Sequence, residues 1–179
     1  MNESKQTPKD RAVTFVGALR RVRNDRGKLA ALRRGLTDNP RMHVDAWPVV
    51  ASLGGDIAQP VFITVAALFA SHPEESNARN FGETCRRIAL GDGRDMPDSF
   101  QSRFRRLLAS GAVEDVSGQL RSWIRLAAGK GVGVNYESLF ADLWNWPWYA
   151  DEIRVKWAKS FWQSGETATE PPTTNATNA

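Results

Sequence analysis

Residues 59–70 read QPVFITVAALFA, the most apolar stretch of the chain, and this stretch decides the fold class. Its large apolar residues recur at helical spacing, at positions Val61, Phe62, Val65, Leu68 and Phe69. A helix that is apolar around most of its circumference is buried in a globular protein. The stretch is too short for a membrane span, which needs roughly 20 residues. We therefore expect a buried helix at the centre of the amino-terminal half.

Apolar residues at the same spacing predict helices on both sides of this stretch, whereas strand signals are weak. In the amino-terminal half, the expected helices cover residues 11–22, with Asp10 as the cap, then 26–34, 45–53, 59–70 and 76–90. In the carboxyl-terminal half, they cover residues 100–109, 112–128, 136–144, with Asn135 as the cap, and 151–162. The predicted fold class is all-α, a two-lobed helical bundle of about eight or nine helices.

The clearest internal break is the Gly/Pro-rich segment GDGRDMP at residues 91–97. It divides the chain into an N-terminal helical lobe over residues 10–95 and a C-terminal helical lobe over residues 96–163. A polar lead-in over residues 1–9 and a Thr/Asn/Pro-rich tail over residues 164–179 are expected to be disordered.

A second turn is expected at Trp146-Pro147-Trp148, and its two tryptophans are candidates for an exposed partner contact. The tryptophans between residues 144 and 162 have the chemistry to stack unpaired bases. Most of them share helical stripes with Leu and Phe, however. A role in the core or in a subunit interface is therefore the favoured interpretation.

Charge is unevenly distributed along the chain, although the formal net charge is only +4. Residues 1–41 carry eleven Lys or Arg against four Asp or Glu, and residues 79–130 carry ten against six. Between these blocks, residues 42–78 hold four acidic residues and no Lys or Arg. Two basic blocks of this kind indicate a polarised surface whose field attracts polyanions. The alternative is an ordinary solvated surface on which charges happen to cluster.

The residue types needed for catalysis or metal binding are scarce. Cys85 is the only cysteine, which excludes an internal disulfide and a multi-cysteine zinc site. His43 and His72 have no metal-ligand spacing, and Asp92 and Asp95 lie in a loop rather than on ordered elements. We therefore expect no enzymatic activity, no catalytic residues, no metal and no cofactor. The polar amino terminus contains no signal segment, so a cytoplasmic protein without membrane contact is expected.

Arginines beside helix cores are the stronger functional signal. Residues 25–35 and 99–110 each place cations outside an apolar helical stripe, and Arg121 and Arg125 share one face of the following helix. Guanidinium groups held on rigid helices suit phosphate recognition, and several of these arginines have no acidic residue four positions away. The candidate phosphate-contacting residues are Arg26, Lys28, Arg33, Arg34, Arg103, Arg105, Arg106, Arg121, Arg125 and Lys130.

Lys130 lies in the glycine-rich segment GKGVG at residues 129–133. A nucleotide-binding loop would require a preceding strand and a Lys-Ser/Thr ending, and this segment has neither. Helix termination is therefore the favoured interpretation of the glycines, with Lys130 still available to a backbone phosphate.

Four segments carry a family resemblance: DRGKLAALRRG at 25–35, SFQSRFRRLLAS at 99–110, LRSWIRLAAGKGVGVNYESLFADL at 120–143 and RVKWAKSF at 154–161. Together they resemble the CasB family, the small subunit of the type I-E CRISPR surveillance complex Cascade. The resemblance extends over most of residues 10–162, in the family's order and at its approximate spacing. The polar tail after Gln163 lies outside it.

The resemblance implies an all-helical, two-lobed subunit without enzymatic activity. Two copies would lie beside the backbone subunits and the large subunit of Cascade, and contact the displaced DNA strand and the hybrid of guide crRNA and target. Two alternatives stay open at this point. One is a helical protein–protein adaptor without direct nucleic-acid contact, because Arg and Trp are also favoured at interfaces. The other is a free-standing helical DNA-binding regulator.

Overall fold

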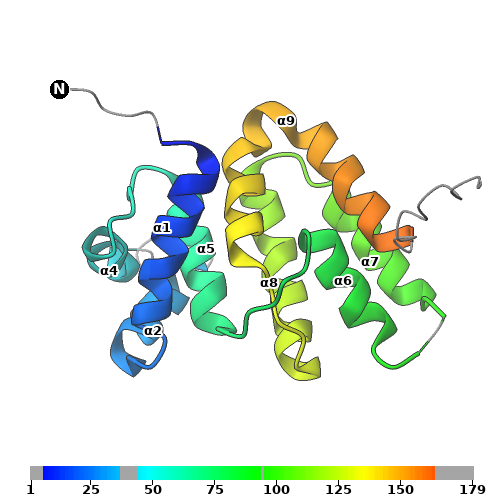
Figure 1. Cartoon of the computed structure of the whole chain (residues 1–179), viewed down its shortest axis with the longest axis horizontal. Coiled ribbons are helices and arrows are strands. Elements are labelled where there is room, and N and C mark those ends of the chain that lie inside the picture. The colour runs from blue at the N-terminus through cyan, green and yellow to red at the C-terminus, as the bar shows by residue number, and fades with distance from the viewer. Residues whose placement is uncertain (1–5, 37–43, 94, 164–179) are drawn as a thin grey trace, which may run out of the picture.

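The structure is a computed structural model that describes residues 6–36, 44–93 and 95–163. In these ranges the chain forms α-helices and short 3-10 turns, with one isolated parallel bridge between Glu75 and Val134, which confirms the all-α class (Figure 1). The elements are α1 (Pro8–Arg21), α2 (Arg26–Arg33), η1 (Arg34–Leu36), η2 (Val44–Ala46), α4 (Trp47–Ser52), α5 (Pro60–Ser71), α6 (Phe81–Leu90), α7 (Asp98–Leu108), α8 (Val113–Lys130) and α9 (Tyr136–Trp162). The disorder expected for residues 164–179, and for residues 1–5 of the lead-in, concerns segments outside the described residues.

Helix ends follow the capping chemistry of the sequence, with two corrections. Asn135 caps α9 as predicted, since its side-chain oxygen accepts a hydrogen bond from the Ser138 amide at 3.0 Å. Asp10 does not cap the first helix. Thr7 is the cap and Asp10 completes a capping box with it, so α1 begins earlier than expected. The helix expected over residues 76–90 begins only at Phe81, because Asn80 caps it.

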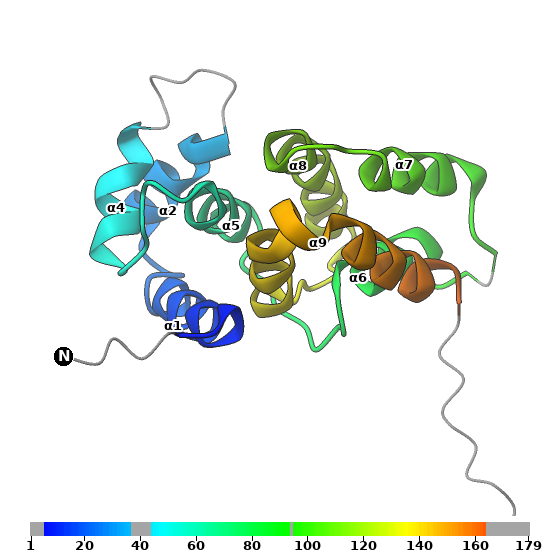
Figure 2. The same ribbon diagram turned by 90° about the horizontal axis from the view of Figure 1, so that it is seen from above.

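Helix α5 is the centre of the amino-terminal half, as the QPVFITVAALFA stretch predicts. Apart from its ends and Ile63, all its residues are buried, and it packs against α1, α2, α4, α8 and α9 (Figure 2). Phe62 makes edge-to-face contacts with Phe15 of α1 and Phe140 of α9, at 4.8 and 5.1 Å between ring centroids. Aromatic pairs in this geometry stabilise a core beyond their buried area.

Helix α9 is one kinked helix where the sequence predicted two helices and a turn. The kink follows Pro147, and Tyr149 has non-helical backbone angles. Proline cannot donate the helical N–H bond, but the helix resumes because both of its halves are held by the core. The first half packs Phe140 on Phe15, and the second half stacks Phe161 on Phe104 of α7 at 3.9 Å.

The two tryptophans that flank Pro147 have opposite environments. Trp148 is 70% exposed, as expected. Trp146 is only 2% exposed, so the expected exposure of this residue is wrong. Its indole N–H donates to the Gly111 carbonyl at 3.0 Å, and its ring lies 5.4 Å from that of Trp157. Trp146 continues the buried stripe of Leu139 and Leu143 on the first half of α9, and its large ring fills the core.

The core is continuous across the two halves of the chain. Helix α6, assigned from sequence to the half before residue 95, lies beside α8 and α9 (Figure 1). The linker between α5 and α6 runs along the linker between α8 and α9, where Glu75 bridges to Val134 and the Asn135 side chain donates to the Ala78 carbonyl. The boundary near residue 95 stays a prediction. Among the described residues, no helix is both long and apolar enough to cross a membrane.

Candidate nucleic-acid interface

A pocket of about 340 Å³ lies between α2, η1, α5 and α8, and three arginines line it. Arg33 comes from α2, and Arg121 and Arg125 come from α8. The remaining lining residues are Leu36, Leu68, Ser71 and Ile124. The pocket therefore unites cations from the two basic blocks of the sequence, which the acidic block separates along the chain.

The arginine of α2 is held in place by the end of α5. The Nε of Arg33 donates to the Ala70 carbonyl at 2.8 Å. This carbonyl belongs to the last turn of α5, where helical carbonyls lack partners within the helix and carry partial negative charge. One edge of the guanidinium is thus occupied, and its other N–H groups have no partner among the described residues.

The arginines of α8 share one face of the helix because they are four residues apart. Arg121 is half-buried and Arg125 is exposed. Neither has an ion pair or a side-chain hydrogen bond with any residue that the structure describes. Unneutralised guanidiniums beside a small apolar wall provide directed donors for an anionic group.

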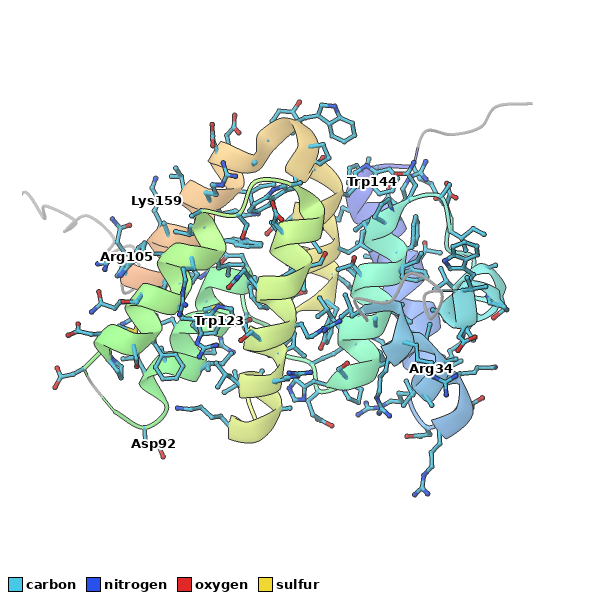
Figure 3. All side chains as sticks on the ribbon, turned by 180° about the vertical axis from the view of Figure 1, so that it is seen from behind. Arg34, Asp92, Arg105, Trp123, Trp144 and Lys159 are labelled. Atoms are coloured by element: carbon cyan, nitrogen blue, oxygen red, sulfur yellow. The ribbon has the colours of Figure 1, made fainter. Side chains whose placement is uncertain are left out.

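The other amino-terminal candidates are placed differently. Arg34 forms an ion pair with Asp45 at 2.9 Å, and Lys28 lies 3.6 Å from Asp25. Arg26 is exposed at the start of α2 without a partner within the described part of the chain. Figure 3 shows Arg34 on the outer side of the α2 region. Two of these cations are therefore already neutralised.

The cations of α7 do not join the pocket. Arg103 donates to the Ser122 hydroxyl at 2.6 Å, which ties its guanidinium to α8. Arg105 and Arg106 are exposed, and no partner for either side chain occurs in the described ranges. Figure 3 shows Arg105 at the end of the molecule opposite to Arg34. Thus the ten candidates do not form a single cluster, and the pocket gathers three of them.

A second basic pocket, of about 630 Å³, lies between α6 and the end of α8, and sequence reasoning missed most of it. Its cations are Arg79, Arg86, Arg87 and Lys130. Glu83 neutralises two of them, pairing with Arg79 at 3.0 Å and Arg87 at 2.6 Å. Spacing was the available signal, because Glu83, Arg86 and Arg87 share one face of α6.

Glu83, which lines this second pocket together with Asp92, is held in its charged form by its neighbours. Burial alone would raise the pKa of the Glu83 carboxyl, but hydrogen bonds from the Arg79 amide and from the Arg79 and Arg87 guanidiniums outweigh it. The net effect is a lowered pKa. Lys130 lies over the Phe100 ring at 5.0 Å, a cation–π contact. Gly131 ends α8 in a left-handed conformation (φ 65°), so the glycine-rich segment terminates a helix.

The fold and its surface define a class before any family is considered. The protein is an all-α bundle with a basic pocket between helices, and its described residues contain no cluster of metal-ligating side chains. Residues 28–162 match the model of the family described as CRISPR-associated protein Cse2. The chain belongs to this family, which confirms the resemblance that the four segments carry.

Several solved structures share the fold of this chain. A Cse2-family CRISPR-associated protein from Thermus thermophilus is 24% identical, with a TM-score of 0.70 over 88% of this chain and 99% of its own. A chain of a CRISPR RNA-guided surveillance complex is 24% identical, with a TM-score of 0.69 over 86% and 92%. CasB from Thermobifida fusca is 19% identical, with a TM-score of 0.65 over 84% and 96%. Among curated proteins, none matches the chain.

Proposed function

We propose that the protein is the non-catalytic small subunit of a type I-E CRISPR Cascade complex in antiviral defence. It binds the sugar-phosphate backbone of the displaced DNA strand and of the guide–target hybrid, and so stabilises the R-loop in the cytoplasm. Its protein partners are the large subunit, the backbone subunits and a second copy of itself. Membership of the Cse2 family supports this role, as does the likeness to a chain of a CRISPR RNA-guided surveillance complex.

The observation that carries the proposal is the convergence of Arg33, Arg121 and Arg125 on one pocket. Phosphate contacts position a protein on nucleic acid without reading its sequence. A subunit of this kind therefore needs few residues beyond well-placed cations, because base pairing with the guide supplies the sequence specificity. The lack of ion pairs to the two arginines of α8 within the described residues leaves their full charge for phosphate.

A small number of cations is sufficient for this role. Exchanging a DNA duplex for a guide–target hybrid is nearly balanced in free energy, so backbone contacts can tip it. Each neutralised phosphate also releases condensed counterions, which adds a favourable, salt-dependent contribution. Arginines that bind the displaced strand bias the exchange toward the open state.

Charge reversal at the pocket tests the proposal. Arg125→Glu, introduced into the assembled complex, is expected to reduce R-loop formation without preventing assembly. Arg21→Glu is the matched control, because Arg21 is also exposed, has no partner among the described residues and lies on α1 (Figure 2). Equal R-loop yields for the wild type and Arg125→Glu complexes would contradict a role for the pocket in strand binding.

The second candidate function is a protein–protein adaptor without direct nucleic-acid contact. The exposure of Trp148 beside an apolar groove favours it, since tryptophan is enriched at the centre of interfaces. The two functions are separated by purified protein at low salt. An adaptor would co-purify with the other subunits and leave the mobility of DNA unchanged.

A further inference from the structure

An apolar groove of about 490 Å³ lies at the kink of α9, away from the basic pockets. It is bounded by the start of α5, the segment between α7 and α8, and the kink itself. Its lining includes Pro60, Val61, Trp144, Trp146, Pro147 and Trp148. Trp146 is fixed by its hydrogen bond to Gly111, whereas Trp148 stands exposed at the edge. A rigid, aromatic-walled groove of this kind fits an extended proline-containing segment.

Two guanidiniums flank the aromatic walls of the groove. Arg11 lies over the Trp144 ring at 5.1 Å, and Arg154 lies over the Trp146 ring at 5.3 Å. Arg154 also pairs with Asp151 and donates to the Ser110 carbonyl. No described carboxylate pairs with Arg11. Arg11 is therefore the cation beside the groove that is left for an acidic residue near the prolines of a bound segment.

An exposed stripe on α9 leads from the end of the helix to this groove. Val155, Lys159 and Trp162 lie at positions i, i+4 and i+7 along the helix, so they share one face. All three are exposed, and Val155 is 53% exposed. Figure 3 shows Lys159 on the outer side of this half of α9. Trp148 lies before the kink residue Tyr149, so the helical spacing of the stripe does not extend to it, but it lines the groove at which this half of α9 begins.

The sequence after Gln163 has the composition that the stripe and groove favour. Residues 164–179 read SGETATEPPTTNATNA, with two glutamates, two consecutive prolines and no Lys or Arg. Consecutive prolines favour the polyproline II conformation, which aromatic-lined grooves recognise at low entropic cost. The glutamates precede the prolines, and so match Lys159 on the stripe and Arg11 beside the groove.

The distances are compatible with this match. The thirteen residues from Ala150 to Gln163 span about 20 Å along a helix, at about 1.5 Å per residue. The eight residues from Gln163 to Pro171 span up to about 26 Å when extended, at about 3.3 Å per residue. Pro171-Pro172 can therefore return to the kink while running antiparallel to the second half of α9.

We propose that residues 164–179 dock onto their own chain along this stripe, with Pro171-Pro172 seated between Trp144 and Trp148. The bound segment covers the most exposed tryptophan of the described residues. This proposal does not depend on nucleic-acid binding, because the groove shares no lining residue with the basic pockets.

A spin label on the full-length chain tests the proposal. Thr173→Cys provides the attachment point, and native Cys85 is fully buried and stays unlabelled. We expect the nitroxide to abolish the indole N–H resonance of Trp148, and ascorbate to restore it. The indole of Trp47, on α4, is the internal control and is expected to be unaffected. Replacing both prolines, with Pro171→Ser and Pro172→Ser, is expected to restore the Trp148 signal while the label is still active.

Mixing experiments decide which chain supplies the segment. Protein that carries the spin label but no nitrogen-15 is mixed with nitrogen-15 protein that carries no spin label. Loss of the Trp148 signal in this mixture as well would mean that a second copy supplies the segment, which overturns docking within one chain. An intact Trp148 signal in the singly labelled protein would overturn the proposal altogether.

Discussion

Arg121 and Arg125 are the two cations that α8 contributes to the pocket beside Arg33, and replacing both by alanine removes most of its unpaired charge. The double substitution Arg121→Ala/Arg125→Ala is expected to leave the fold intact. Neither side chain has a hydrogen-bond partner in the described part of the structure, and alanine is the best helix former. Any change in affinity for nucleic acid therefore reports on contact with phosphate.

The magnitude follows from the number of guanidiniums removed. Each phosphate contact to a single strand adds about 0.7 to the slope of log K against log salt. Two lost contacts reduce this slope by about 1.4, which at about 0.1 M salt raises Kd by a factor of about 25. This factor corresponds to about 1.9 kcal/mol of binding free energy. The difference is expected to vanish near about 1 M salt, because counterion release no longer contributes there.

Fluorescence anisotropy with a labelled single-stranded oligonucleotide, titrated at several salt concentrations, measures both the affinity and the slope. The matched control is Lys28→Ala/Arg34→Ala, which removes the same net charge from cations that are paired with Asp25 and Asp45. The control is expected to change the slope by less than the α8 variant does. Equal slopes for the two variants would refute the reasoning, since binding would then depend on net charge and not on the pocket.

Further outcomes follow from packing and burial. Gly82→Ala is expected to destabilise the fold by about 3 kcal/mol or more in urea unfolding, because its Cβ would overlap the Trp157 carbonyl. Gly118→Ala, with no atom near its Cβ, should stabilise the helix by up to about 1 kcal/mol. Folding lowers the pKa of Glu83, so the Glu83 carboxylate stabilises the fold above the ordinary Glu pKa, and this stabilisation is lost as pH falls through the folded pKa. Glu83→Gln should therefore reduce the loss of unfolding free energy between neutral and acidic pH. Burial raises the pKa of the Cys85 thiol, so a thiol reagent at mildly alkaline pH should modify it only after unfolding.

Local features of the fold were predictable from the sequence. The spacing of apolar residues indicated α5 and the stripes of the other helices, and Asn135 marked the start of α9. These signals lie within one or two helical turns, so they do not depend on the rest of the molecule. Capping was less certain where two polar residues compete, as with Thr7 and Asp10, because only the backbone geometry decides which of them caps.

The candidate site was predictable only in part. The sequence identified Arg33, Arg121 and Arg125 as candidates together with seven other cations, without distinguishing among them. Asp45 neutralises Arg34 across a distance of eleven residues, which a search for partners one helical turn away does not detect. Trp146 likewise lies in the core and Trp148 outside it, although both flank the same proline.

The sequence by itself determined the all-α class, the helix that forms the centre of the core and the family to which the chain belongs. Periodicity, capping and family motifs are all encoded in short stretches of residues, so they can be recognised without knowledge of the packing. Tertiary structure alone decided that Arg33 meets Arg121 and Arg125, and which other cations are bound by neighbours. The crossing of α2, α5 and α8 sets these contacts, and helix crossings depend on the simultaneous packing of side chains from the whole chain.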